Sequence, residues 1–473
     1  MYNDTCRSLI LAAILFASAA RAEGPSADEL ARRSLERRAI EAVIWGMPAV
    51  NLDLMFQAMV GSAKGKVNQI VYWSRLPDWK NQTLTPNPDV IYLMPFFNTR
   101  DVGPMVLEIP PADDGVINGT IMDAWQVPLE DVGPAGVDKG KGGKYLILPP
   151  DYRAVVPKEY IALPSMNYQG YALLRSLLKS GSDADVAKAV VYAKRIKLYP
   201  LSQAAKPPAT VFVDAIDVVY DATIPYDLRF FQSLDRVVQV EPWLPRDKVM
   251  IDMLKSIGIE KGKPFDPDAK TQDILKSAAR EAQALLERRY DGTFRPYFDI
   301  SRWALPSLPD YSKASQDGFS DPNAYPFDSR GVVFTFAFFT PKHLGKGQFY
   351  LMTIQDKAGR NFDGSKGYRL EVPANAPVNQ YWSATVYDRA THGLIRGMTR
   401  SGRGSQSQGL VKNADGTVSL YFGPKAPAGK DANWVPTKPG AQFEVLFRFY
   451  GPEKPLFDKT WKLPDIEEIA AQE

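Results

Sequence analysis

The chain of 473 residues carries 57 Lys and Arg side chains against 54 Asp and Glu, a net charge of +3 at neutral pH. Because these charges form no basic stripe or polybasic tail, we expect neither nucleic acid nor an anionic membrane surface as a partner. A chain of this length can build two or three domains, and its 38 Pro and 34 Gly residues favour turn-rich β architecture over a helical bundle.

The N-terminus has the pattern of a secretory signal peptide, which we place at residues 1–22. Arg7 gives the start a positive charge, an apolar run extends from Ser8 to Ala20, and small residues flank Arg21. The run is too short to span a bilayer, so the sequence predicts a periplasmic or secreted protein without a membrane anchor. The single cysteine, Cys6, lies in this peptide, so the mature chain would have neither disulfides nor a thiolate nucleophile.

Helical patterns occur at the start of the mature chain and in its middle. Ser26 and Glu29 have the spacing of a capping box, and a helix is predicted from Leu30 to Gly46. Pro48 is expected to interrupt it, with a second piece from Leu52 to Met59. Further helices are predicted from Tyr168 to Lys179, from a Ser182 cap to Tyr199, from Tyr226 to Ile257 with breaks at Pro242 and Pro245, and from Asp268 to Tyr290.

Short apolar runs separated by Pro, Gly and Asp predict two β regions. The spacing of the second is typical of a sandwich or jelly roll. The segment from Val332 to Phe339 stays open, because its residues favour a strand whereas Pro341 and Gly345 can end a buried helix. The first region comprises Val90 to Phe97, Met105 to Ile109, Val116 to Trp125 and Tyr145 to Leu148, and the second comprises Phe349 to Ile354, Tyr368 to Val372, Tyr381 to Tyr387, Thr417 to Phe422 and Phe443 to Tyr450.

Metal, nucleophile and cofactor chemistry find little support in the residues. The two histidines, His343 and His392, lack the spacing of a metal site, and we find neither a serine-nucleophile motif nor a phosphate-binding loop. The stretch from Asp356 to Gly364 concentrates turn oxygens, but it lacks the order of a helix-loop-helix calcium site. We interpret it as a turn, leave calcium open there, and otherwise expect no metal and no cofactor.

The loop from Thr85 to Tyr92 is the clearest candidate for a functional segment. Pro86 and Pro88 fix the backbone on either side of Asn87, which places Asp89 on a stiff loop before a buried strand. This loop is also part of a larger pattern. Three N-terminal motifs resemble the bacterial family known as domain of unknown function 1254, namely Thr85-Pro86-Asn87-x-Asp89-x-x-Tyr92, Gly103-Pro104-x-Val106-Leu107-Glu108-Ile109-Pro110 and Met122-Asp123-Ala124-Trp125.

The last part of the chain resembles the usual companion of that family, domain of unknown function 1214. The resemblance implies a mixed α and β fold that is mainly β, with an immunoglobulin-like sandwich within residues 23–165, a helical segment at 166–345 and a jelly-roll-like domain at 346–473. It also implies a helix over Val332 to Phe339. The matching motifs are Gly367-Tyr368-x-Leu370-x-Val372-Pro373, Tyr381-Trp382-Ser383-x-Thr385-x-Tyr387-Asp388, Asn433-Trp434-x-Pro436 and Arg448-x-Tyr450-x-Pro452.

If the two sandwiches face each other, side chains from both could line one cleft. We predict Asp89, Asp123 and Tyr92 as catalytic residues, because paired carboxylates in unlike environments support general acid/base chemistry. The alternative is that both carboxylates tie loops together through backbone amides. Trp382 is expected in the core, on the strand face opposite Tyr381. The predicted substrate-binding residues are Asn87, Trp125, Tyr381, Arg396, Trp434 and Arg448.

The sequence therefore favours an exported, metal-independent hydrolase or lyase that acts on a small polar or sugar-like substrate. Two alternatives stay open. One is a non-catalytic protein that binds a carbohydrate or a metabolite. The other is a structural envelope protein whose apolar helical segment packs against further copies in a homo-oligomer.

Overall fold

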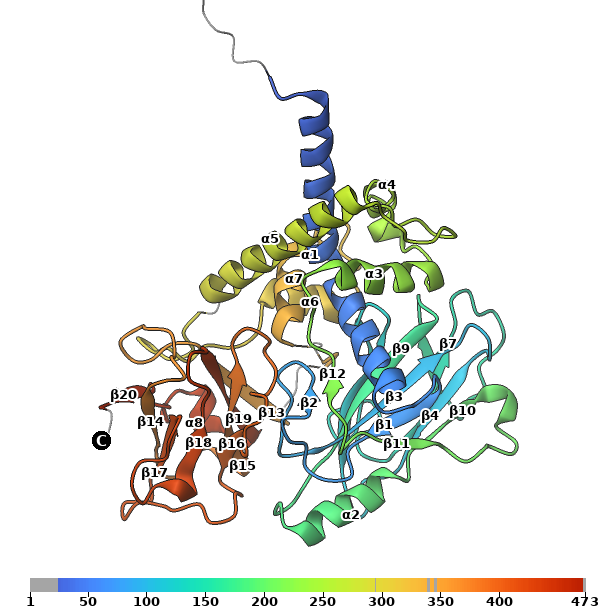
Figure 1. The fold of residues 1–473 in the computed structure, drawn as a ribbon. Coiled ribbons are helices and arrows are strands. Elements are labelled where there is room, and N and C mark those ends of the chain that lie inside the picture. Colours follow the sequence, from blue (N-terminus) through green and yellow to red (C-terminus); the bar gives the residue numbers. More distant parts are fainter. Residues whose placement is uncertain (1–23, 294, 338–340, 344–346, 471–473) are drawn as a thin grey trace, which may run out of the picture.

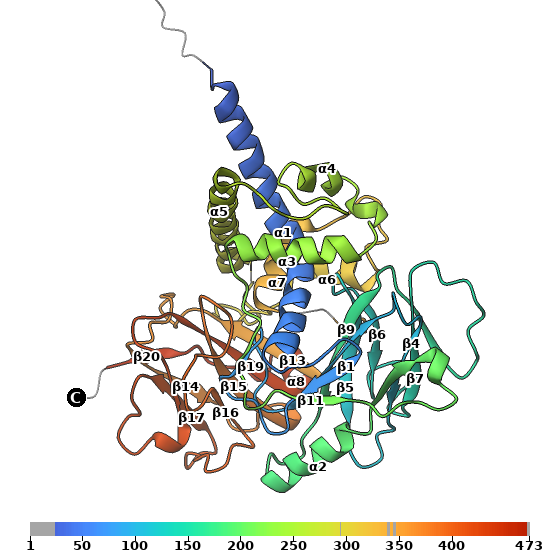
Figure 2. The same ribbon diagram turned by 45° about the vertical axis from the view of Figure 1, so that its right-hand side comes forward.

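The computed structural model describes residues 24–293, 295–337, 341–343 and 347–470, so the predicted signal peptide lies outside the described residues. Two β regions lie side by side beneath a layer of helices (Figure 1; Figure 2, turned by 45°). Helix and strand are nearly balanced, at 27% and 26%, so the expectation of a mainly β fold is wrong. The mixed α and β character is confirmed, whereas the immunoglobulin-like and jelly-roll types stay predictions.

The N-terminal β region contains two sheets with one shared core. Their strand orders are β11-β1-β3-β9-β5-β6 and β10-β4-β7-β8, and side chains from both, such as Phe97 and Ile147, pack into one cluster. The strands are β1 (Gln69–Tyr72), β3 (Ile91–Asn98), β4 (Met105–Ile109), β5 (Ile117–Asp123), β6 (Pro128–Val132), β7 (Gly143–Leu148), β8 (Ile161–Pro164), β9 (Gln169–Ser176), β10 (Lys197–Pro200) and β11 (Phe212–Asp214), with β2 (Asn81–Gln82) and β12 (Tyr220–Asp221) paired separately.

Strand β9 shows that the helix predicted from Tyr168 to Lys179 is wrong. Its residues pair with β3 on one side and with β5 on the other, which makes it a central strand of the larger sheet. Most of the strand is buried on both faces. A continuously apolar run has the same pattern in a buried helix and in a buried strand, so tertiary pairing decides. The predicted helical segment at 166–345 consequently begins with strands.

Helix α1 (Ala27–Gly61) runs through the helical layer. The Ser26 hydroxyl accepts a hydrogen bond from the Glu29 amide at 3.2 Å, which confirms the predicted cap. Pro48 lies inside this single helix, so the expected interruption is wrong. Proline removes one backbone donor there, and the helix continues because the residues around Pro48 are buried against the rest of the layer. The helix has the length and composition of a membrane span, but 83% of its apolar window is buried inside the protein.

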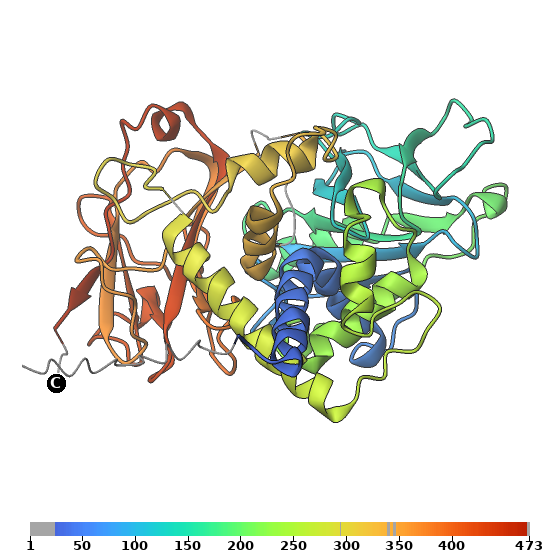
Figure 3. The same cartoon turned by 90° about the horizontal axis from the view of Figure 1, so that it is seen from above.

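The other helices of the layer pack around α1, as the view from above shows (Figure 3). They confirm the helices predicted over 226–257 and 268–290, and the segment left open after Val332 is helical through Phe336. Helix α2 (Asp183–Ala193) lies apart, is capped by Ser182 as predicted, and ends before Tyr199 because β10 begins at Lys197. The helices of the layer are α1, α3 (Leu228–Val240), α4 (Met250–Lys255), α5 (Ala269–Thr293), α6 (Pro309–Gln316) and α7 (Phe327–Phe336).

The C-terminal β region also has two sheets, ordered β13-β19-β15-β16 and β18-β17-β14-β20. All five strands predicted here are confirmed. Trp382 lies in the core and stacks on Phe447 at 5.4 Å between ring centroids, also as predicted. The elements are β13 (Gln348–Thr353), β14 (Gly367–Val372), β15 (Val378–Asp388), β16 (Gly402–Gly404), β17 (Val418–Gly423), β18 (Trp434–Pro436), β19 (Phe443–Pro452), α8 (Lys454–Phe457) and β20 (Glu467–Ile469).

Glu241, directly after α3, ties the helical layer to the start of β9. Its carboxylate accepts hydrogen bonds from the backbone amides of Tyr168 at 2.7 Å and Gln169 at 2.9 Å. Burial raises the pKa of Glu241 from 4.5 to about 7. We expect Glu241→Ala to lower the free energy of unfolding by about 2–4 kcal/mol, measured by urea denaturation, because two amide donors lose their acceptor.

The same residue should make stability depend on pH. The folded state keeps the proton of Glu241 more strongly than the unfolded state does, so its contribution to stability falls as the pH rises from 4.5 through about 7. Urea denaturation of the wild type and Glu241→Gln at several pH values should therefore show the stability of the wild type decreasing relative to the variant across this window. Parallel pH profiles would contradict the assignment.

Candidate binding site between the two β regions

A cavity of about 520 Å³ lies between the two β regions, and we call it the inner chamber. The N-terminal region contributes Tyr92 of β3 and Arg175 of β9, and the C-terminal region contributes Tyr350 of β13 and Arg448 of β19. A volume of this size suits a small organic molecule. Apolar side chains supply much of the remaining wall, among them Leu305, Phe336, Phe349, Met352 and Leu446.

The loop from Thr85 to Tyr92 forms one edge of the inner chamber and docks on the C-terminal sheet. Asn87 organises it: its Oδ1 accepts from the Asp89 amide at 2.9 Å, and its own amide donates to the Tyr92 hydroxyl at 2.9 Å. The Asn87 side-chain amide also donates to the Tyr450 hydroxyl on β19. The predicted stiff loop is thus held by its own turn and by the other β region.

Arg448 joins this loop to the chamber and is only 2% exposed. Its guanidinium donates to the Thr85 carbonyl at 3.0 Å, the Thr385 hydroxyl at 3.0 Å and the Tyr387 hydroxyl at 2.6 Å. All of these partners are neutral, and no carboxylate of the described residues forms an ion pair with Arg448. A buried cation without a paired anion is costly, so the chamber has an uncompensated positive charge.

Asp89 lies next to the chamber without lining it. Its Oδ2 is buried and has no hydrogen-bond partner among the described residues. Burial raises the pKa of Asp89, and this effect outweighs the opposing influence of the Ser383 hydroxyl and the Arg448 charge. Asp89 therefore holds its proton to a higher pH than an ordinary aspartate, which makes it a weak counter-ion for Arg448.

Asp123 does not join Asp89. On strand β9, Ser176 pairs with Ile91 near Asp89, whereas Gly170 pairs with Asp123. Six residues of strand separate these positions by about 20 Å, so the predicted acid pair does not form. The Asp123 carboxylate instead accepts from the amides of Trp125 and Val127, both at 2.9 Å, and closes a turn, as in the alternative interpretation. Burial raises the pKa of Asp123 to about 6.

The structure brings together some predicted binding residues and separates others. Asn87 and Arg448 line the inner chamber, as does Tyr92. Tyr381 is buried behind Asn87 and stacks on Tyr450 at 4.2 Å. The other three lie elsewhere: Trp125 packs on Trp45 of α1 at 4.5 Å, Arg396 pairs with Asp221 of β12 at 2.6 Å, and the Trp434 indole donates to the Gly423 carbonyl at 2.9 Å. The catalytic roles of Asp89, Asp123 and Tyr92 stay predictions.

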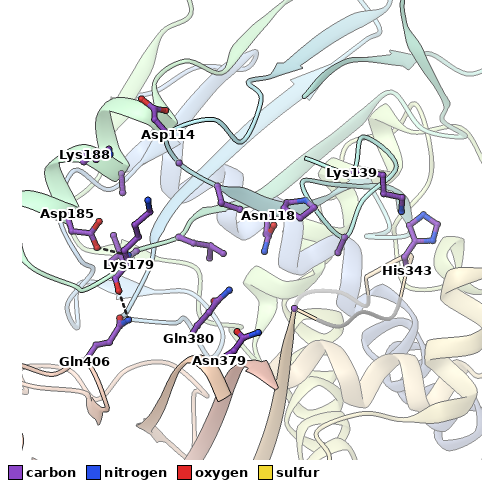
Figure 4. Close-up of a pocket in the computed structure, with 18 residues that line it drawn as sticks. Asp114, Asn118, Lys139, Lys179, Asp185, Lys188, His343, Asn379, Gln380 and Gln406 are labelled. Atoms are coloured by element: carbon purple, nitrogen blue, oxygen red, sulfur yellow. Dashed lines mark hydrogen bonds between the residues drawn. The ribbon is translucent and has the colours of Figure 1, made fainter. Parts of the chain in front are cut away.

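A second cavity, the outer cleft, has a volume of about 820 Å³ and adjoins the inner chamber (Figure 4). The two volumes share Asn118, Ala135, His343 and Gly347 as lining residues. Polar side chains from both β regions and from the α2 segment face into the outer cleft, namely Lys139, Lys179, Lys188, Asn379, Gln380 and Gln406.

Comparison with known families supports the assignment of the two β regions. Residues 67–200 match the model described as "Protein of unknown function (DUF1254)", and residues 347–454 match "Protein of unknown function (DUF1214)". The chain belongs to the DUF1254/DUF1214 family. The seven motifs quoted from the sequence all lie within these two matched segments.

A solved structure shares the fold of this DUF1254/DUF1214 protein. The crystal structure of the VPA0106 protein from Vibrio parahaemolyticus is similar over 92% of this chain and 100% of its own, at 18% identity and a TM-score of 0.54. A putative uncharacterized protein from Burkholderia cenocepacia covers 93% of this chain and 94% of its own, at 11% identity and a TM-score of 0.41. No curated protein matches the chain significantly.

Sequence reasoning missed Arg175 and Tyr350, which line the inner chamber of the DUF1254/DUF1214 protein. Arg175 had a signal: it is a charged residue inside the apolar run from Tyr171 to Leu178. Such a residue is costly to bury without a function or a partner. It lies with its guanidinium 5.5 Å from the Tyr92 ring centre, and Arg448 lies 5.5 Å from that of Tyr350. Tyr350 had no signal that distinguishes it from a core aromatic residue.

His392, considered above only as a metal ligand, belongs to a buried ion network of the DUF1214 region. Its Nδ1 lies 2.8 Å from Glu444, which also accepts from the Tyr290 hydroxyl of α5 at 2.7 Å. Burial lowers the pKa of His392, but Glu444 and Glu287 outweigh it and raise the value to about 9. The network therefore joins the helical layer to the C-terminal sheet through a protonated histidine.

We expect His392→Gln to lower the free energy of unfolding by about 3–5 kcal/mol near pH 6, because Glu444 loses its buried partner. The contribution of His392 is complete below its ordinary pKa of 6.5 and is lost as the pH rises through about 9, so the difference should shrink in that window. Thermal and urea unfolding measure it. His343→Gln is the matched control, because His343 is exposed, and an equal loss in both variants would contradict the prediction.

Proposed function

We propose that this protein, once exported to the periplasm or beyond, binds a small organic acid in the inner chamber, with the carboxylate of the ligand on Arg448. The observation that carries the proposal is the buried Arg448 guanidinium, whose described hydrogen-bond partners are all neutral. A ligand carboxylate would compensate its charge, and the planar fork of an arginine matches a carboxylate in two parallel hydrogen bonds.

A second cation strengthens the preference for an anionic ligand. Arg175 lines the same chamber from the other β region, so both walls contribute positive charge. The lining acid, Asp131, is already used, because its carboxylate accepts from Thr120 at 2.6 Å and from the His343 amide at 2.7 Å. Asp89 has a raised pKa and does not line the chamber. Among the described lining residues, two guanidinium groups stand against the one carboxylate of Asp131, so the lining has a net positive charge.

The walls support a ligand with an apolar body over a sugar. Phe336, Phe349 and Leu446 offer surfaces that a hydrocarbon chain or an aromatic ring can cover, whereas a sugar needs polar partners around its whole rim. The sugar-like substrate expected from the sequence is therefore less well supported than an amphipathic acid. Such an acid would place its charge near Arg448 and its body against these apolar side chains.

The proposal predicts that 3-phenylpropionate or octanoate binds the wild-type protein, whereas the uncharged 3-phenylpropionamide does not. Arg448→Met should weaken binding by about 100-fold or more in isothermal titration calorimetry, because a charge-assisted pair worth roughly 3 kcal/mol is lost. Thr385→Val is the matched control: it removes one neutral contact of the same guanidinium and should keep affinity within about threefold.

Because Arg448→Met removes a buried residue, each variant is first compared with the wild type by thermal unfolding. Should Arg448→Met not fold, the pair of acid and amide ligands still decides, since only a ligand that binds the folded state raises the melting temperature of the wild type. Equal stabilisation by acid and amide, or by neither, would overturn the proposal.

A second candidate is acid/base catalysis on the bound acid by Asp89 alone. It is favoured by the raised pKa of Asp89 and by its buried Oδ2, which has no partner among the described residues. A carboxylic acid with a raised pKa keeps its proton to a higher pH than usual and can donate it to a reacting group. This candidate keeps the hydrolase or lyase chemistry expected from the sequence, but Asp89 alone would transfer the proton in place of a pair of aspartates.

If Asp89 is catalytic, the wild type should convert 3-hydroxyoctanoate to 2-octenoate and water, followed by chromatography, with the Asp89 proton passing to the leaving hydroxyl, and Asp89→Asn should abolish this loss and leave the affinity nearly unchanged. The melting temperature should stay the same or rise near neutral pH. A carboxyl whose pKa is raised by folding lowers the free energy of unfolding at pH values above its pKa in the unfolded chain, and Asn removes this effect. Thr385→Val again serves as the control with intact turnover. A variant that unfolds, or that retains turnover, would assign Asp89 a structural role.

A further inference from the structure

The inner chamber and the outer cleft are neighbouring cavities that share part of their lining. Asn118 and Ala135 line both volumes. The chain that follows β9 runs from Arg175 in the chamber to Lys179 in the cleft, and Gln380 in the cleft directly precedes Tyr381 behind the chamber. Because both walls continue from one volume to the other, one ligand can extend through both.

The outer cleft carries a second concentration of positive charge. Lys179 and Lys188 lie together beside α2, whereas Lys139 lies on the other side of Asn118 near His343 (Figure 4), and none of the three forms an ion pair with a carboxylate in the part of the chain that the structure describes. Two acids, Asp185 and Asp114, also line the cleft and offset part of this positive charge. Asp185 accepts from the Lys179 amide at 2.6 Å, and Asp114 pairs with Arg195 at 2.9 Å.

The separation of the two positive sites follows from the chain. Arg175 and Lys179 are four residues apart, so their Cα atoms are separated by at most about 13 Å in an extended segment. The path between them passes the amides of Asn118 and Gln380, which can bind water or polar ligand atoms. A ligand with one charge at each end would thus place an apolar middle in the chamber and its far end among the lysines.

We infer that the ligand of this site is a linear dicarboxylate of medium chain length, with one carboxylate on Arg448 and Arg175 and the other near Lys179 and Lys188. The inference rests on the proposed function, which supplies the first carboxylate, and adds the second. Exposed ammonium groups bind a carboxylate weakly one at a time, so the gain comes from two lysines acting on one end of an already anchored ligand.

The test compares decanoate with decanedioate, which share chain length and differ in the second carboxylate. We expect the wild type to bind decanedioate at least about tenfold more tightly in isothermal titration calorimetry. The double variant Lys179→Gln/Lys188→Gln should lose this advantage and keep its affinity for decanoate. Lys158→Gln/Lys412→Gln removes the same charge from exposed positions outside the cleft and should keep the advantage.

The outcomes separate this inference from the proposed function. If the wild type binds decanoate and decanedioate equally, or if both double variants lower the advantage to the same extent, the second anionic site is wrong and the monoacid site stands. If neither acid binds the wild type, the proposed function itself fails. Hexanedioate, which is shorter, should show less gain over hexanoate than decanedioate shows over decanoate, and an equal gain would contradict the spanning geometry.

Discussion

The contact of Arg448 with the loop from Thr85 to Tyr92 is the interaction on which the site depends. One guanidinium holds the Thr85 carbonyl of the N-terminal region while it is fixed by Thr385 and Tyr387 of the C-terminal sheet. Charge and position are thereby linked: the residue that joins the two regions is also the cation that faces the chamber. Burying this charge with neutral partners alone costs free energy. The proposed anionic ligand would lower that cost by pairing with the guanidinium.

Further contacts hold the two β regions in a fixed position relative to each other. Arg396 pairs with Asp221 across the junction, and the Tyr387 hydroxyl donates to the Pro86 carbonyl at 2.7 Å. The helical layer adds a third connection, because α5 reaches the C-terminal sheet through Tyr290 and Glu444. These ties lie at separate places around the junction. A cavity bounded by them can therefore keep its shape without a ligand, which favours binding over collapse.

Much of the fold could be predicted from local patterns. The Ser26 cap, the alternation around Trp382 and most strands were predictable because each depends on residues close together in the chain. Two errors share one cause. The segment from Tyr168 to Lys179 has a helix-favouring composition and Pro48 is a helix-breaking residue, yet strand neighbours decide the first and the packing of α1 in the helical layer supports the second. Neither partner is visible in the local sequence.

The sequence by itself determined the family, the two β regions, and the presence of Asn87, Tyr92 and Arg448 in conspicuous motifs. Only the tertiary structure decided that Asp123 lies at the opposite end of β9 from Asp89, and that Arg175 joins Arg448 in one chamber. The physical reason is that the net charge of a site depends on which side chains are buried together and on which of them form ion pairs. Those are properties of distant contacts, which local residue patterns do not contain.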